Sequence, residues 1–176
     1  MIKKTLKITF FLLGFILSAQ SNSNIEAKVN GLLNKMTLKE KIGQMAQINL
    51  TVIAKGPNKW SSYEPLMIDL NKARKAILEY KVGSVLNATN NTARSNKKWN
   101  EIIAKIQQIS MKESRLGIPV IYGIDGIHGA TYTSNATMFP QQITTAATWN
   151  TTNAFNMAKV AAVSYTHLRA HETIPD

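Results

Sequence analysis

Cysteine is absent from all 176 residues of the chain. Its absence excludes a disulfide framework and the attachment of a lipid to an N-terminal thiol. There is also no internal repeat, no long linker, and no apolar run of the roughly 20 residues that a membrane-spanning helix needs. With 44% hydrophobic and 18% charged residues, the composition is that of a folded domain with a sizeable core.

The N-terminus has the pattern of a secretory signal peptide. Lysines precede the apolar run ITFFLLGFILSA, and small residues around Ser21 offer a cleavage site. We predict a signal peptide over residues 1–21 and no stable membrane anchoring after cleavage, with a retained N-terminal anchor as the alternative. Because export without disulfides suits a bacterial periplasm or exterior, the expected location is periplasmic or secreted.

The charge of the chain is strongly basic. The formal net charge is +11, and residues 22–162 hold 17 basic and 8 acidic residues, a net of +9. Such a balance could attract nucleic acid. However, the lysines occur singly or in pairs on predicted helical faces, with no aromatic interleaving and no nucleic-acid motif. We therefore predict a solvated basic surface and no nucleic-acid partner.

Helical and strand patterns alternate along the chain. Strands are predicted within residues 44–50, 82–88, 115–125 and, as a short fourth one, 141–149; helices are predicted over residues 25–36, 38–46, 66–80, 95–114 and 153–163. Thr37 and Glu40 form a capping box ahead of the second helix. This alternation predicts βαβ units and a parallel sheet, either in a (β/α) barrel or in an open doubly wound fold.

The stretch IPVIYGIDGIHGATY (residues 118–132) places an Asp and a His on a glycine-rich turn directly after an apolar strand. Ligands of parallel sheets bind at such strand ends. The two oxygens of Asp125 match a pair of sugar hydroxyls, and His128 could donate to the same ligand. Alternatively, Asp125 braces the loop through backbone amides and His128 only supports it. The glycines lack the spacing of a dinucleotide-binding fingerprint.

The segment LGIPVIYGIDGIHGATYTSNATMFPQQITTAATWN resembles the N-terminal domain of glycoside hydrolase family 3, in particular its exported β-glucosidase branch. LLNKMTLKEKIGQM and VGSVLN are similar to earlier parts of the same domain, in the same order. The resemblance implies an α/β fold, an incomplete (β/α)8 TIM-type barrel with its first three or four βα units. It also implies that Asp125 binds sugar hydroxyls, and the residues after it favour the glucosidase and xylosidase side of the family.

Retaining hydrolysis needs two carboxyl groups about 5 Å apart. The resemblance places the nucleophilic Asp and the acid/base Glu after the end of this chain, so no catalytic residue is assigned. The implied parent protein hydrolyses β-linked gluco- or xylo-oligosaccharides without a cofactor or metal, and an oligosaccharide or glycoside is its expected partner. The alternative is a non-catalytic carbohydrate-binding α/β module.

The C-terminal peptide VSYTHLRAHET (residues 163–173) matches a translation of the end of a transposase-based sequencing adapter. We therefore predict a truncated family 3 domain over residues 22–162 and an adapter-derived tail over 163–176. The tail places His167 and His171 at the spacing of a helical zinc pair, but it lacks the Glu of H-E-x-x-H, so no metal site is predicted. Because three or four strands cannot close a barrel, the isolated chain is expected to fold poorly and to lack glycosidase activity. It should also expose an apolar stripe formed by Ile102, Ile103, Ile106 and Ile109.

Overall fold

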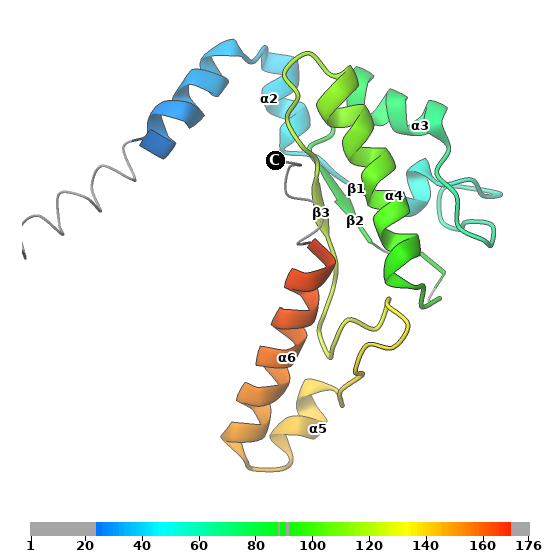
Figure 1. The fold of residues 1–176 in the computed structure, drawn as a ribbon, viewed down its shortest axis with the longest axis vertical. Helices are drawn as coiled ribbons and strands as arrows, with labels where there is room; N and C mark the ends of the chain where they lie inside the picture. The colour runs from blue at the N-terminus through cyan, green and yellow to red at the C-terminus, as the bar shows by residue number, and fades with distance from the viewer. Residues whose placement is uncertain (1–23, 88, 91, 170–176) are drawn as a thin grey trace, which may run out of the picture. The chain divides into compact units, whose positions relative to one another are not determined.

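The computed structural model describes residues 24–87, 89, 90 and 92–169, and the chain divides into two compact units, Met1–Lys41 and Ile42–Asp176 (Figure 1). The predicted signal peptide lies outside the described residues, as does the end of the predicted tail. No helix of the described segments is long and apolar enough to cross a membrane.

The first unit is helical where it is described. A helix covers residues 24–35, and α2 (Leu38–Gln44) begins at the end of this unit. The amide of Glu40 donates to Thr37 Oγ1 at 3.2 Å, and the amide of Thr37 donates to Glu40 Oε2 at 2.8 Å. These reciprocal bonds satisfy two amides that the helix itself leaves without a partner, and they confirm the predicted capping box.

A parallel three-stranded sheet organises the second unit. Its strands are β1 (Gln47–Asn49), β2 (Ser84–Leu86) and β3 (Ile121–Gly123), in the order β1-β2-β3. Three of the four predicted strands are therefore present. The connections that run between them contain η1 (Leu50–Ile53), α3 (Leu70–Arg74) with the π-helical turn η2 (Lys75–Glu79), and α4 (Asn96–Gln108) with the π-helical turn η3 (Ile109–Glu113).

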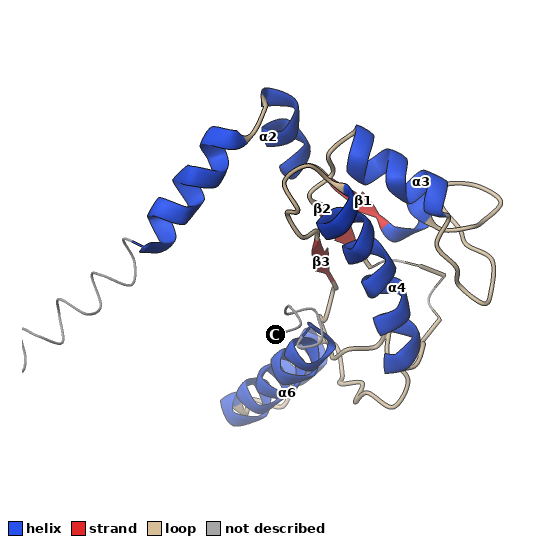
Figure 2. Ribbon diagram, turned by 45° about the horizontal axis from the view of Figure 1, so that its top comes forward, coloured by secondary structure: helices blue, strands red, loops and turns tan. Residues whose placement is uncertain are grey.

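The helices α3 and α4 both lie on one side of this sheet (Figure 2). The central residues of β2 and β3, Val85 and Tyr122, are buried together with one face of α4 in a single apolar cluster. Ser95 caps α4, because its side chain accepts a hydrogen bond from the amide of Lys98 at 3.2 Å. Two βα units thus build a core by themselves.

The expectation of an exposed isoleucine stripe along α4 and the start of η3 was wrong. The four isoleucines are between 0% and 5% exposed: Ile102, Ile103, Ile106 and Ile109. Their neighbours in the core are residues of the sheet and of the first connection, including Leu50, Val85 and Tyr122. The strands that precede and follow the helix therefore bury the isoleucine side chains. This burial does not require later βα units.

Residues 141–149, predicted as a fourth strand, instead contain the short helix α5 (Gln142–Ala146). Their β-branched residues favour a strand, but propensity yields to context. Pro140 lies two residues before the helix, and the amide of Thr145 donates to the Gln141 carbonyl at 3.0 Å. The helix packs on α6 (Thr151–Arg169), where Thr145 Oγ1 lies 3.3 Å from Met157 Sδ.

Candidate functional site

Asp125 lies just after β3 and has an exposed side chain, as Ile121 does within the strand. Along the strand Ile121 is 59% exposed and Tyr122 is 2% exposed, and two residues past Gly123 the side chain of Asp125 is exposed again. Among the described residues, the Asp125 carboxylate makes no hydrogen bond or salt bridge. A carboxylate in this place can accept hydrogen bonds from a ligand at the carboxyl end of the sheet.

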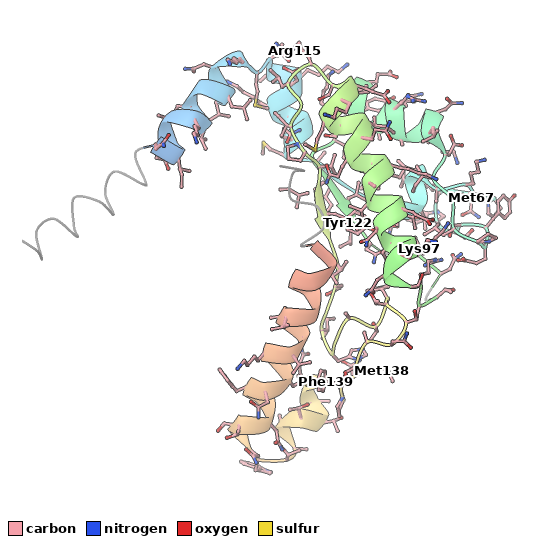
Figure 3. The ribbon with its side chains drawn as sticks, in the orientation of Figure 1. Met67, Lys97, Arg115, Tyr122, Met138 and Phe139 are labelled. Carbon is pink, nitrogen blue, oxygen red and sulfur yellow. The ribbon has the colours of Figure 1, made fainter. Side chains whose placement is uncertain are left out.

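Asp125 lies in a glycine-rich segment that leads away from the end of β3. We call this segment the corner (residues 123–134). Gly129 has a φ of +111°, which an L side chain rarely adopts. The amide of Phe139 donates to the His128 carbonyl at 2.7 Å and ties the corner to the segment that leads to α5. Figure 3 labels Phe139 on this segment and Tyr122 on β3.

His128 is half-buried in the corner, three residues after Asp125. Its Nδ1 atom is buried and has no hydrogen-bond partner among the described residues, so no bond joins it to the Asp125 carboxylate. A buried ring nitrogen without a protein partner is uncommon in a folded chain. The two predicted residues therefore share one turn, and their binding role stays a prediction.

The loop after β2 holds both ends of the corner. At the start, the amide of Asn87 donates to the Gly123 carbonyl at 2.7 Å. At the end, the amide of Arg94 donates to the Tyr132 carbonyl and the amide of Ser134 donates to the Arg94 carbonyl, both at 2.9 Å. The position of the corner thus depends on the conformation of the neighbouring loop.

Arg94 and Glu64 form a salt bridge that no sequence pattern indicated. Arg94 is only 6% exposed, donates from Nη1 to Thr89 Oγ1 at 2.8 Å, and lies 5.3 Å from the centre of the Trp99 ring. The Trp99 Nε1 atom in turn donates to the Tyr132 carbonyl at 2.8 Å. Neither Arg94 nor Glu64 belongs to a recognisable motif, because the pair joins loops that lie 30 positions apart.

Most other described carboxylates bind partners within the protein. Glu40 completes the capping box, Asp69 accepts hydrogen bonds from the amides of Asn71 and Lys72 at the start of α3, and Glu101 lies 3.7 Å from Lys98. Asp125 therefore differs from these carboxylates in that its oxygens remain free for a ligand.

Arg74, the last residue of α3, and Glu113, the last residue of the π-helical turn after α4, form an exposed salt bridge. The guanidinium of Arg74 donates from Nε to Glu113 Oε2 at 2.8 Å and from Nη2 to Glu113 Oε1 at 3.0 Å. The hydrogen bond to Arg74 lowers the pKa of the Glu113 carboxyl, and the same bond raises the pKa of Arg74. Such a partnered carboxylate on the surface is a structural group rather than a candidate reactant.

In the described part of the chain, no group of three or more His, Asp or Glu side chains is placed to hold a metal ion. A hollow of about 380 Å³ lies between α5 and α6, and its lining includes Phe139, Thr145 and Met157. Neither Asp125 nor His128 lines this hollow, and no charged side chain does. We therefore place the candidate site at the corner, where the unpaired carboxylate of Asp125 lies in a glycine-rich turn.

Comparisons with known proteins identify the family to which this fold belongs. Residues 37–173 match the glycosyl hydrolase family 3 N-terminal domain. A lysosomal beta glucosidase of Dictyostelium discoideum is 33% identical over 143 residues, which are 76% of this chain and 16% of that protein. The crystal structure of an exo-1,3/1,4-beta-glucanase from a Pseudoalteromonas species is similar with a TM-score of 0.50 and 26% identity, over 70% of this chain and 14% of that one.

The chain therefore spans only 16% and 14% of the lengths of these two relatives. The family match overlaps residues 163–173, so the adapter origin of that segment stays a prediction. Three parallel strands, their two helical connections and a matched region that covers most of the chain lead to one conclusion. The chain belongs to glycosyl hydrolase family 3 and represents part of its N-terminal barrel domain.

Proposed function

We propose that the chain is the first part of an exported, retaining β-glucosidase-type hydrolase that acts on β-linked gluco- or xylo-oligosaccharides. The observation that carries the proposal is the free carboxylate of Asp125 at the carboxyl end of β3, in a chain of a glycoside hydrolase family. The names of the two relatives, a beta glucosidase and an exo-1,3/1,4-beta-glucanase, support the substrate class.

In this proposal Asp125 binds the sugar and does not react with it. An ionised carboxylate can accept hydrogen bonds from two adjacent sugar hydroxyls, and His128 adds a ring nitrogen on the same turn. Retaining hydrolysis requires two carboxyl groups about 5 Å apart. Five of the other described carboxylates already have partners within the protein: Glu40, Glu64, Asp69, Glu101 and Glu113. The nucleophile and the acid/base would therefore come from later parts of the intact protein.

The test compares the intact gene product with its Asp125→Asn variant in the hydrolysis of an aryl β-glucoside. Each hydrogen bond to a charged acceptor contributes about 1.5–3 kcal/mol, so the loss of one charged bond should lower kcat/KM by roughly 10- to 150-fold. Glu101→Gln is the matched control, because Glu101 is a surface carboxylate on α4. An Asp125→Asn enzyme that keeps the wild-type kcat/KM would rule out the binding role.

Turnover also separates the hydrolase from the alternative, a carbohydrate-binding module. The intact protein is expected to hydrolyse the aryl β-glucoside, and the 176-residue chain alone is expected not to. Calorimetric binding of cellobiose by the intact protein without any turnover would favour the binding module. Cell fractionation and the N-terminal sequence of the mature protein would test export and cleavage near residue 21.

A further inference from the structure

Arg94 contacts all three loops at the carboxyl end of the sheet. Its Nη2 donates to Glu64 in the loop between β1 and α3. Its Nη1 donates within its own loop, to Thr89 Oγ1 at 2.8 Å and to the Thr92 carbonyl at 3.0 Å. Its backbone makes two hydrogen bonds to the end of the corner, so one residue links the segment that carries Asp125 to both earlier loops.

The surroundings of the guanidinium make this linkage rigid. Only 5% of the Arg94 side chain is exposed, and its planar group lies over the indole ring of Trp99. A buried charge is costly unless it is paired and hydrogen-bonded, so the conformations in which Arg94 leaves Glu64 are strongly disfavoured. The Trp99 indole also donates to the Tyr132 carbonyl, which gives the corner a second attachment to the same cluster.

Glu64 is in turn held in place by its own loop and by the loop after β2. Its Oε2 accepts from the amide of Leu66 at 3.1 Å, and its Oε1 accepts from Asn90 Nδ2 at 3.3 Å. Asn90 also donates to the Ser62 carbonyl at 2.6 Å. The loops after β1 and β2 therefore form one hydrogen-bonded unit, in which Arg94 contacts the end of the corner and Asn87 contacts its start.

We propose that Arg94 is a positioning residue for sugar binding: it holds the corner in the conformation in which the Asp125 carboxylate meets the sugar hydroxyls. Its effect on substrate rests on the proposed function, whereas its effect on the corner backbone does not. Arg94 reaches the ligand only through the corner, so its loss should act on binding without removing a reacting group.

Hydrogen exchange of the intact protein tests the structural part. Arg94→Met keeps an apolar stem over Trp99 but removes the pairing with Glu64. Exchange in residues 125–134 is expected to rise about tenfold (~1.4 kcal/mol), with little change in β3 itself. Arg74→Met is the matched control, because it removes an Arg–Glu pair at the other ends of α3 and α4 and should leave the corner unchanged.

Kinetics with an aryl β-glucoside test the functional part. Arg94→Met should raise KM and lower kcat/KM about tenfold, whereas a mere loss of folded enzyme would lower kcat at unchanged KM. In an Asp125→Asn background, Arg94→Met should change kcat/KM by less than about twofold. The reason is that both substitutions act on the same sugar contact, the one made by the Asp125 carboxylate. Arg94→Lys keeps a positive charge opposite Glu64 but lacks a second nitrogen that could donate to Thr89. It should therefore recover part of the kcat/KM that Arg94→Met loses.

The outcomes separate the two proposals. If the wild-type protein does not hydrolyse the glucoside, the proposed function fails and hydrogen exchange still decides the role of Arg94. If Arg94→Met does not fold, Glu64→Gln replaces it, with exchange of the corner expected to rise about threefold as a charged bond becomes neutral. Unchanged exchange in the corner, an equal rise across the whole sheet, or additive effects with Asp125→Asn would overturn the inference.

Discussion

Replacing Gly129 with alanine perturbs the corner at the point where the backbone tolerates a side chain least. An added Cβ would lie 2.2 Å from the Thr137 carbonyl oxygen and 3.4 Å from Phe139 Cδ2. Carbon–oxygen contacts normally lie beyond about 3.3 Å, so the Thr137 carbonyl would have to move by roughly 1 Å. The φ of +111° adds backbone strain for any residue with a Cβ.

The magnitude follows from two contributions. An unfavourable backbone conformation costs about 1–3 kcal/mol. Displacing Thr137 also disturbs the hydrogen bond from the Phe139 amide to the His128 carbonyl, for which about 0.5–1.5 kcal/mol is typical. The opening free energy of the corner should therefore fall by about 1.5–4.5 kcal/mol, which corresponds to roughly 10- to 2,000-fold faster amide exchange.

The assay is hydrogen exchange of the intact protein, read in residues 125–139. Gly126→Ala is the control in the same turn, because its added Cβ meets only the Gly129 carbonyl oxygen, at 3.9 Å. Its exchange should stay within a few-fold of wild type, since such substitutions usually change stability by less than about 0.5 kcal/mol. Equal exchange in the two variants would refute the steric reasoning.

Two further predictions concern the rest of the domain. Ile106→Ala, at a side chain with no exposed surface, should destabilise the domain by about 2–5 kcal/mol in urea unfolding, and an effect no larger than that of Lys105→Ala would contradict the core described for α4. Because Arg74 lowers the pKa of Glu113, the stability that this pair contributes is full above the unfolded pKa of about 4.3 and is lost as the pH falls through the lower folded value. The melting temperatures of wild type and Arg74→Met should thus differ at roughly pH 7 and converge well below roughly pH 4, and a difference that persists in acid would be evidence against this pair.

The sequence determined the local elements and the family. Thr37 and Glu40 predicted a capping box, residues 95–114 predicted the helix that contains α4, and three of the four predicted strands are present, because these signals depend on residues a few positions apart. The sequence also predicted the turn around Asp125, because a glycine-rich segment after an apolar strand indicates the end of that strand. Family motifs, rather than periodicity, favoured the barrel over the open sheet.

Tertiary structure decided what depended on distant neighbours. The β-branched residues 141–149 became the helix α5, which packs on α6, and the isoleucines of α4 found partners in the sheet that precedes and follows it. The pairing of Arg94 with Glu64 joins two loops that carry no motif, so nothing short of the folded chain could identify it. Local signals can be read from sequence because their geometry is fixed by the backbone, whereas a contact between loops exists only once the strands beneath them are in register.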